Sequence, residues 1–405
     1  MEPKKIIYRE KYFRYIKPYI DDNLIKVLIG QRRVGKSYIL YQLMEEIENR
    51  VPEANIIYID KEDYAFDEIK NYSDLVSYVE AKSKTDRKKY LFIDEVQDIK
   101  DFERALRHFQ SNGNYDIYCT GSNASLLSGE IATLLAGRYI QIRVFSLSYL
   151  EFLKFHKLKD SSESLRKYII YGGMPHLINL KSEDRIYFEY LQNVFDSIIL
   201  RDIVARYNIR NVSFLQDLIR FLCDNIGSLV SAKKISDYLK SQKINLLPKT
   251  ILEYLSYLES VFFVDRVKRI EIGGKKIFEI GDKFYFEDMG IRNSVVPFKQ
   301  KDINKALENI VYHHLRATRF KAYVGKFGDK EIDFVAEKNG KSYYIQVAYL
   351  IADEKTHERE FGNLLKIEDN RPKMVVSMDE LAGGEYEGVR HWNLRKFLTD
   401  FAVKD

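Results

Sequence analysis

The sequence predicts an α/β protein, because short apolar runs alternate with amphipathic helical segments through its N-terminal part. Such alternation over about 120 residues is typical of a parallel sheet with helices on both faces. The length of 405 residues fits two or three domains. Hydrophobic residues make up 45% of the chain and charged residues 31%, which excludes a wholly disordered or fibrous protein.

The N-terminal sheet is expected to have five strands separated by four helical stretches. The apolar runs that predict strands are residues 24–29, 55–60, 90–93, 117–120 and 139–143. The helical stretches are expected near residues 36–49, 72–83, 101–110 and 123–136.

The rest of the chain divides by pattern into three further segments. Residues 147–230 are expected to be helical, with a break at the YGGMP sequence of residues 171–175. Two short helices at 231–241 and 248–260, followed by strands at 262–270 and 277–286, have the order of a winged helix. From residue 296 a helix near 303–319 precedes three strands, at 321–325, 331–337 and 342–348. A further helix, a strand at 374–377 and a last helix at 393–402 are expected to follow.

The first segment, residues 1–20, carries six basic and two acidic residues and has tyrosines at helical spacing. One interpretation is an arm that contacts nucleic acid or membrane. The other is a helix whose aromatic face packs on the following domain. The predicted division is therefore 1–20, 21–146, 147–230, 231–295 and 296–405.

Composition excludes several classes of protein. Two cysteines, Cys119 and Cys223, cannot make a disulfide framework or a cysteine-rich zinc site. The N-terminus lacks the apolar stretch of a secretory signal, and no run of about 18 apolar residues occurs, so we expect a cytoplasmic protein without a membrane span. The net charge of +5 arises mostly in the first segment, and it does not by itself indicate nucleic-acid binding.

The most specific motif is the run Gly30, Gln31, Arg32, Arg33, Val34, Gly35, Lys36 and Ser37. It fits the P-loop pattern, and an apolar run precedes it while a helical stretch follows it. Glycines let backbone N–H groups surround phosphates, and the helix N-terminus adds a positive dipole. Lys36 is then expected to neutralise phosphate oxygens, and Ser37 to bind Mg²⁺.

A second motif, YLFIDE at residues 90–95, ends an apolar run in two acidic residues. Beside a P-loop it predicts that Asp94 holds Mg²⁺ and that Glu95 is the general base for the attacking water. The run 55–60 lies between the two motifs. The fold class is therefore a P-loop NTPase parallel sheet with an extra strand between the Walker A and Walker B strands.

Two further sets of residues are candidates. Ser122 and Asn123 end an apolar run and are expected either to orient water near the γ-phosphate or to cap the next helix. Arg138 is expected to be either an arginine finger, on its own site or a neighbour's, or an ion-pair partner at the start of a strand. The adjacent histidines His313 and His314 have no further ligands at metal spacing and are expected to be ordinary helix residues.

With these residues in view, the chain resembles the prokaryotic AAA+ ATPases, and within them the predicted ATPases with a C-terminal domain of unknown function that resembles restriction endonucleases. The resemblance covers nearly the whole chain. It rests on these segments: GQRRVGKS at 30–37, YLFIDEVQ at 90–97, TGSNASLL at 120–127, LAGR at 135–138, FSLSYLEF at 145–152, YGGMP at 171–175, RDIVARYNIRN at 201–211, KFYFEDMGIRN at 283–293, LEN at 307–309, EIDFV at 331–335 and YYIQV at 343–347.

The resemblance implies an ATPase domain, a winged-helix segment and a nuclease-like α/β domain. A nuclease of this kind needs a helix Glu, a strand Asp and a Glu-x-Lys on the next strand. Glu308 and Asp333 fill the first two places, but the third holds Gln346 and the lysine place holds Ala348. A neutral amide is a weaker Mg²⁺ ligand, so the nuclease-like site is expected to be degenerate, unless Lys341 substitutes for the missing lysine.

These observations predict an Mg²⁺-dependent ATPase with ATP and Mg²⁺ as cofactors, whose nucleotide state is coupled to the winged-helix and nuclease-like segments. Two alternatives remain: a nucleotide-gated switch or scaffold with little turnover, and an ATP-dependent DNA nuclease. The partner is left open between DNA and protein, as is the oligomeric state. The would-be recognition helix carries Glu253 and Glu259, which argues against reading DNA through it.

Overall fold

The computed structural model describes residues 7–83, 87–124, 135, 137–241, 244, 246–274, 277–351, 353–380 and 382–403. The chain divides into two compact units. Unit 1 consists of Met1–Phe145 and Ser260–Phe262, and unit 2 consists of Ser146–Glu259 and Phe263–Asp405.

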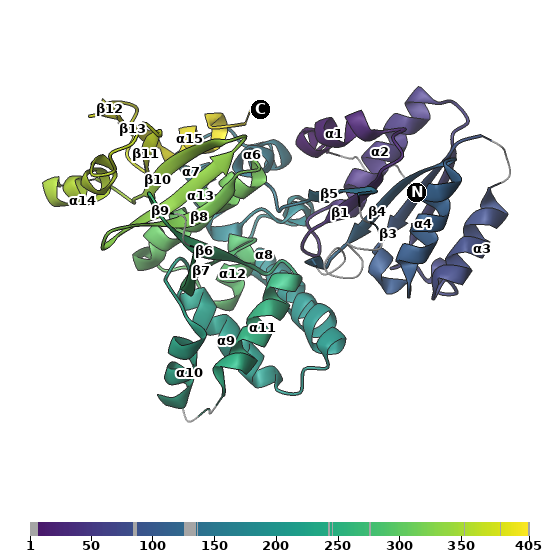
Figure 1. The fold of residues 1–405 in the computed structure, drawn as a ribbon, viewed down its shortest axis with the longest axis horizontal. Coiled ribbons are helices and arrows are strands. Elements are labelled where there is room, and N and C mark those ends of the chain that lie inside the picture. Colours follow the sequence, from purple (N-terminus) through teal and green to yellow (C-terminus); the bar gives the residue numbers. More distant parts are fainter. Residues whose placement is uncertain are drawn as a thin grey trace. The chain divides into compact units, whose positions relative to one another are not determined.

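Unit 1 is built on a five-stranded parallel sheet in the order β2-β3-β4-β1-β5 (Figure 1). The strands are β1 (Ile25–Ile29), β2 (Asn55–Asp60), β3 (Lys89–Asp94), β4 (Tyr115–Gly121) and β5 (Tyr139–Arg143). All five predicted strands are confirmed, because buried parallel strands read as continuous apolar runs. Strand β4 lies between β1 and β3, so the P-loop and the acidic motif both follow strands that flank β4.

Helices cover both faces of this sheet, as the alternation of side chains along β1 requires. Ile25, Val27 and Ile29 face a core shared with α3 and α4, whereas Leu28 faces a core shared with α1 and α2 (Figure 1). The helices are α1 (Glu10–Ile16), η1 (Lys17–Tyr19), α2 (Lys36–Arg50), η2 (Tyr64–Phe66), α3 (Tyr72–Lys82), η3 (Val96–Asp98) and α4 (Phe102–Asn112). The helix expected at 123–136 falls largely on residues 125–134 and 136, which lie outside the described residues.

The described part of the N-terminal segment, from residue 7 onward, packs on the rest of unit 1 and does not extend as an arm. Tyr12 and Ile16 of α1, together with Ile20, are buried in the core that contains α2. This is the second of the two interpretations offered by its tyrosine spacing.

Unit 2 begins with a run of helices, as predicted. They are α6 (Tyr149–His156), α7 (Ser162–Tyr171), η5 (Pro175–Asn179), α8 (Asp184–Ser197), η6 (Ile198–Ala205) and α9 (Val212–Asp224). The later helices of unit 2 are α10 (Ala232–Ser241), α11 (Pro248–Ser260), α12 (Met289–Val295), η7 (Gln300–Asp302), α13 (Ile303–Ala317), α14 (Glu354–Leu365) and α15 (Leu394–Asp400). The YGGMP break follows α7, where a side chain at Gly173 would lie 2.3 Å from the Leu147 carbonyl oxygen. Glycine is needed there because two backbone segments touch.

An eight-stranded mixed sheet completes unit 2, in the order β12-β13-β11-β10-β9-β8-β6-β7. Its strands are β6 (Val264–Glu271), β7 (Ile277–Phe286), β8 (Lys321–Phe327), β9 (Lys330–Lys338), β10 (Lys341–Val347), β11 (Lys373–Ser377), β12 (Glu385–Tyr386) and β13 (Val389–Asn393). The hairpin expected as a wing is β6–β7, and β6 pairs in parallel with β8. The structure therefore departs from the boundary expected at 295–296, since strands from both sides of it form one sheet.

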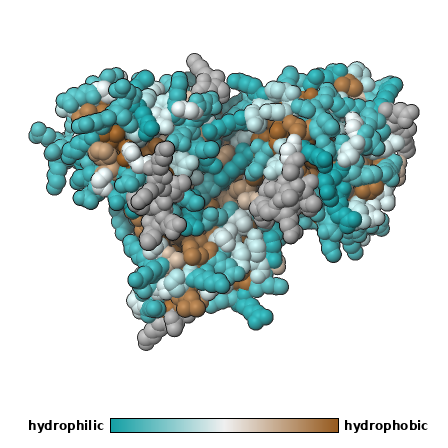
Figure 2. All heavy atoms as spheres, in the orientation of Figure 1, coloured by the Kyte–Doolittle hydropathy of each residue, from teal (hydrophilic) through white to brown (hydrophobic). Residues whose placement is uncertain are grey.

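Within the described residues, no helix combines the length and apolarity that crossing a membrane requires. The face drawn in Figure 2 is mostly hydrophilic, with hydrophobic atoms in separate patches.

Candidate nucleotide-binding site

The P-loop joins the carboxyl end of β1 to the N-terminus of α2. A Cβ atom at Gly30 would lie 2.2 Å from the carbonyl oxygen of Val144, so only glycine fits at this close approach. Gly35 caps α2 with a φ of 95°, a left-handed conformation that glycine adopts readily. The loop therefore turns directly into a helix N-terminus, which is the geometry that favours bound phosphate.

Lys36 lies at the centre of this site and is 4% exposed. Its amino group donates to the carbonyl oxygens of Gly30 and Gln31, at 3.1 and 3.2 Å. The same nitrogen lies 3.3 Å from a carboxylate oxygen of Glu95. The structure thus brings the P-loop lysine and the predicted general base together.

Asp94, the last residue of β3, meets two hydroxyl groups. Ser37 and Thr120 both hydrogen-bond its carboxylate. Tyr58 on β2 also donates to it, at 3.4 Å. Burial raises the pKa of Asp94 above its ordinary value, and the two hydroxyl hydrogen bonds oppose that rise. Ser37 and Asp94, the two residues predicted to hold Mg²⁺, are in direct contact.

Glu95 follows with a left-handed backbone, at a φ of 54°. Its N–H donates to the Thr120 hydroxyl at 2.9 Å, and its carboxylate accepts from Gln97 at 2.5 Å. Burial alone would raise the pKa of Glu95, but the Lys36 ammonium and the Gln97 hydrogen bond hold it at about 2. The carboxylate is therefore ionised at neutral pH, the state in which a base can accept a proton.

Ser122 and Asn123 are both buried at the end of β4. Ser122 hydrogen-bonds Glu95, and its hydroxyl lies 3.5 Å from the Gln97 amide nitrogen. The structure thus places Ser122 beside the predicted base. Thr120 was missed by sequence reasoning, although the small polar run that it begins was the available signal.

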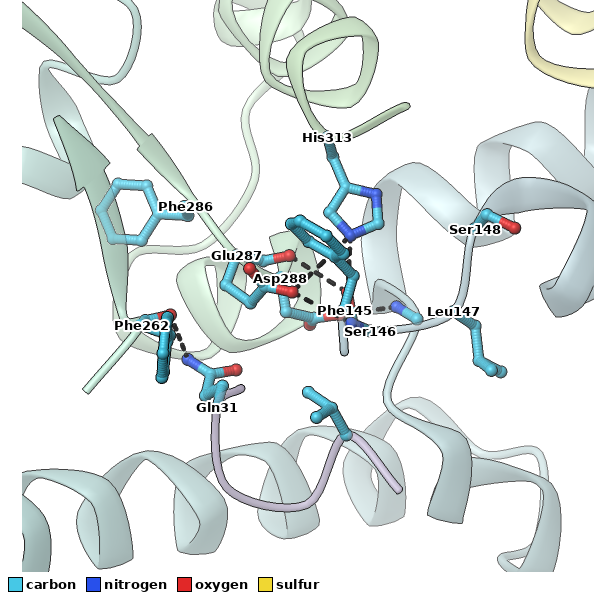
Figure 3. A network of polar contacts seen from close by, with 12 residues as sticks. Gln31, Phe145, Ser146, Leu147, Ser148, Phe262, Phe286, Glu287, Asp288 and His313 are labelled. Carbon is cyan, nitrogen blue, oxygen red and sulfur yellow. Dashed lines mark hydrogen bonds and ion pairs between the residues drawn. The ribbon is translucent and has the colours of Figure 1, made fainter. Parts of the chain in front are cut away.

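The arginines of the loop have different surroundings. Arg32 is buried and pairs with Glu62 at 2.5 Å, and it helps to lower the pKa of Glu95. Arg33 is exposed. Gln31 is buried, and its amide donates to the Phe262 carbonyl oxygen at 3.3 Å, as Figure 3 shows.

Arg138 does not join this group. It is exposed at the residue before β5, and the neighbouring Tyr139 pairs with Ile25 at the start of β1. The P-loop follows the other end of β1, about 16 Å away at roughly 3.3 Å per residue. The geometry thus separates Arg138 from the phosphate loop of its own chain, and the described side-chain contacts include no ion pair for it either.

A second polar cluster lies in unit 2, around Lys283 of β7. Its ammonium group is 2.6 Å from Glu308, 2.9 Å from Glu331 and 3.6 Å from Asp333. Tyr285 also hydrogen-bonds Glu308. Burial alone would lower the pKa of Lys283, but the three carboxylates raise it well above its usual value.

The structure brings Glu308, Asp333 and Gln346 close to one another around Lys283. The Asp333 N–H donates to the Gln346 side-chain oxygen at 3.4 Å. Burial and the neighbouring Glu308 raise the pKa of Asp333. The lysine of this cluster is Lys283, whereas Lys341 is exposed at the start of β10. Sequence reasoning missed Lys283 because it precedes Glu308 by 25 residues, on a strand assigned to another segment.

Ser146, Glu287 and His313 form a buried cluster within unit 2 (Figure 3). The Ser146 hydroxyl donates to the Glu287 carbonyl oxygen at 3.1 Å, and His313 Nε2 lies 3.2 Å from that hydroxyl and 3.8 Å from the Glu287 carboxylate. A serine triad needs different ring nitrogens for the serine and the acid. One nitrogen faces both here, so the cluster anchors the start of unit 2 rather than forming a nucleophile.

Comparisons with known proteins agree with this geometry. Residues 22–153 match the profile of the AAA domain family, and residues 162–302 match a domain of unknown function, DUF8612. An uncharacterized protein of Haemophilus influenzae is 35% identical over 392 residues, which cover 95% of this chain and 97% of that protein. The uncharacterized protein MJ1544 of Methanocaldococcus jannaschii is 30% identical over 88% of this chain and 83% of its own length.

Among solved structures, the Walker-type ATPase paby2304 of Pyrococcus abyssi is 14% identical, covers 72% of this chain and 95% of that chain, and has a TM-score of 0.49. The chain belongs to the same family as the Haemophilus influenzae protein, and its N-terminal part is an AAA domain of the P-loop ATPase type.

Proposed function

We propose that the chain binds ATP with Mg²⁺ at the P-loop of unit 1 and hydrolyses it. The observation that carries this proposal is the cluster in which Lys36 contacts both the loop and Glu95 while Ser37 contacts Asp94. These contacts join the phosphate-binding, metal-binding and base functions in one buried site.

The donor atoms suit Mg²⁺. This ion prefers oxygen ligands and usually takes one or two protein oxygens together with phosphate oxygens and water. The Ser37 hydroxyl and the Asp94 carboxylate would hold it, and it would neutralise charge on the phosphates. The described residues include no group of three or more His, Cys, Asp or Glu side chains that could hold a metal ion, and a P-loop site does not require one.

The residues then divide the reaction between them. Lys36 and the N-terminus of α2 bind the β- and γ-phosphates. Glu95 accepts a proton from the water that attacks the γ-phosphorus, and ADP leaves with the electrons of the broken P–O bond. Ser122 hydrogen-bonds the base and keeps its carboxylate oriented. The left-handed backbone of Glu95 is the kind of local strain that occurs at functional sites.

Replacing Glu95 with Gln tests this assignment. Glu95→Gln keeps the size of the side chain but removes the base, so we expect turnover to fall by about 10²–10⁴-fold while ATP still binds. Phosphate release and retained ATP after gel filtration are the two measurements. Glu48→Gln, an exposed position on α2, is the matched control. Unchanged turnover in Glu95→Gln would sink the assignment.

The nucleotide state is proposed to act on unit 2. The chain passes between the units at 145–146, 259–260 and 262–263, and the last two crossings flank a short segment that belongs to unit 1. Gln31 of the P-loop donates to the backbone of that segment, at Phe262. Nucleotide bound at the loop can therefore move a segment that continues directly into β6. Stimulation of turnover by double-stranded DNA would identify DNA as the partner, and turnover indifferent to DNA would favour a protein.

The nuclease-like cluster of unit 2 is proposed to be inactive. Lys283 places an ammonium ion among Glu308, Glu331 and Asp333, where a nuclease would need Mg²⁺. We expect no cleavage of supercoiled plasmid by the full chain with Mg²⁺ or Mn²⁺, with or without ATP. Metal-dependent cleavage that disappears in Asp333→Ala would contradict this and restore the nuclease alternative.

A further inference from the structure

We infer that Arg9, in the segment before α1, is a positioning residue for the P-loop. By fixing the outer side of the loop it orients the Gly35 N–H toward bound phosphate. The inference rests on the proposed function, because it concerns how tightly that site holds a nucleotide.

The guanidinium of Arg9 is almost completely buried, with the residue 2% exposed. Its Nη1 donates to the Val34 carbonyl oxygen at 2.8 Å and to the Phe145 carbonyl oxygen at 3.0 Å. It also lies over the ring of Tyr12, 4.6 Å from the ring centroid. The Tyr12 hydroxyl in turn accepts from the Phe145 N–H at 2.9 Å. Arg9 and Tyr12 thus connect the loop to Phe145, two residues after the end of β5.

The carbonyl held by Arg9 belongs to the peptide that joins Val34 to Gly35. In a planar trans peptide the C=O and the N–H point in opposite directions. A carbonyl fixed toward Arg9 therefore turns the Gly35 N–H away from Arg9. The backbone is left-handed at Arg33, with a φ of 68°, and again at Gly35, the kind of turn in which successive N–H groups form a concave anion site.

The positive charge acts on the same peptide. A buried guanidinium attracts the negative end of the Val34 carbonyl and increases the positive character of the amide on its far side. Lys36 donates to two other carbonyl groups of the loop, those of Gly30 and Gln31. Arg9 and Lys36 therefore hold different carbonyl groups of one loop.

The hydrogen bond from Arg9 to Phe145 connects the P-loop to the end of the first segment of unit 1. Phe145 is the last residue of the first segment of unit 1, and Ser146 begins unit 2. A change in the loop that moves the Val34 carbonyl therefore changes a hydrogen bond at the point where the chain leaves the ATPase sheet.

The test compares three variants of the full chain. Arg9→Met keeps much of the buried stem but removes the donors, Arg9→Lys keeps the charge, and Arg14→Ala changes an exposed arginine of α1. Isothermal titration with ADP in Mg²⁺ gives the Kd, and ATP turnover gives kcat and KM. Circular dichroism melts show whether each variant is folded.

We expect Arg9→Met to raise the Kd for ADP about tenfold, the size associated with losing a charge-assisted hydrogen bond. KM should rise similarly and kcat should change less than about twofold, because Arg9 holds the Val34 and Phe145 carbonyl groups, which belong to the phosphate loop and the residues after β5 rather than to the proposed base. Arg9→Lys should lie between Arg9→Met and the wild type, and Arg14→Ala should match the wild type.

Three results would overturn the inference. The first is an ADP affinity of Arg9→Met within twofold of the wild type. The second is a loss of kcat with unchanged KM and Kd. The third applies if Arg9→Met does not fold. An ADP affinity of Arg9→Lys equal to that of the wild type would then contradict the expected loss and leave Arg9 with a role in folding alone. A wild-type chain that binds no ADP would refute the proposed function itself, which separates the two failures.

Discussion

Thr120 links the two acidic residues of the proposed site, although it belongs to neither of the motifs that define it. Its hydroxyl donates to Asp94 and accepts from the Glu95 N–H. A single side chain therefore sets the carboxylate that would hold Mg²⁺ and the backbone turn that places the base. Partners of metal ligands commonly change metal affinity by 10–100-fold when removed.

Thr120→Val removes this hydroxyl without changing the shape of the side chain. We expect the Mg²⁺ concentration for half-maximal ATP turnover to rise about tenfold. The variant should also lose about 1–3 kcal/mol of stability, because the buried Glu95 N–H loses its acceptor. A titration of turnover with Mg²⁺ measures the first effect. Thr120→Ser, which keeps the hydroxyl, is the control, and an unchanged Mg²⁺ dependence in Thr120→Val would contradict the role.

Site residues that belong to one sequence motif are easier to predict than site residues that meet only through the pairing of strands. Lys36, Ser37, Asp94 and Glu95 follow from local spacing, and the structure brings them together. Thr120 acts through the alignment of β4 with β3, which no local spacing reveals. Arg138 also belongs to a sequence motif, but it lies at the start of β5. Because β5 and β1 are parallel, the start of β5 lies at the opposite edge of the sheet from the P-loop, which follows the end of β1.

Among the elements, β1 and β4 are joined by a buried ion pair near their N-terminal ends. Lys26 and Asp116 contact each other with both side chains fully buried. Asp116 also accepts from the Tyr118 hydroxyl and the Asp21 N–H, each at 2.8 Å. Burial lowers the pKa of Lys26 although Asp116 opposes the effect. Lysine is rarely tolerated inside a strand buried on both faces unless it is paired in this way.

Asp116→Asn is expected to leave Lys26 without its counter-charge and to lower the free energy of unfolding of unit 1 by about 3–5 kcal/mol. Hydrogen exchange of peptides from β1 and β4 reports on this unit alone. Asp67→Asn, at an exposed position, should exchange like the wild type. Protection of β1 in Asp116→Asn equal to that of the wild type would show that the pair contributes little.

The elements themselves were predictable where burial is continuous. The strands of unit 1 read as apolar runs, and their ends differ from the predicted ones by no more than two residues. The β6–β7 hairpin was also predicted as an element, but its place was not. Helix, helix and hairpin is the local order of a winged helix, whereas the partner of β6 is β8, whose residues lie more than 50 positions later. β13 is short and half polar, so its apolar signal was too weak to predict it.

Over the whole molecule, the two units differ in how far sequence explains them. Unit 1 carries a motif whose chemistry is known in general terms, so its fold and proposed activity follow together. In unit 2, Gln346 occupies the place where the resemblance predicts an acidic ligand, and Lys283 joins this cluster from a strand distant in sequence. Lys283 meets Asp333 because β7 and β9 lie in one sheet, an arrangement that local sequence patterns do not reveal.

The proposed coupling between nucleotide binding and unit 2 depends on how the chain is divided between the two units. Residues 260–262 belong to unit 1 although the residues before and after them belong to unit 2. Phe262 is buried in the core of unit 1 and has a left-handed backbone, with a φ of 57°. A large residue adopts that conformation only when its surroundings require it. The proposed coupling would therefore begin with the hydrogen bond from Gln31 to Phe262, in a segment that is followed in sequence by residues of unit 2.

Phosphate release from ATP by the wild-type full chain, with Mg²⁺ and with EDTA, tests the central claim most directly. We predict continuous Mg²⁺-dependent release of many equivalents of phosphate per chain, lost in Lys36→Ala. Release that stops at one equivalent would favour a nucleotide-gated switch. Release no greater than that of Lys36→Ala would contradict the proposed ATPase.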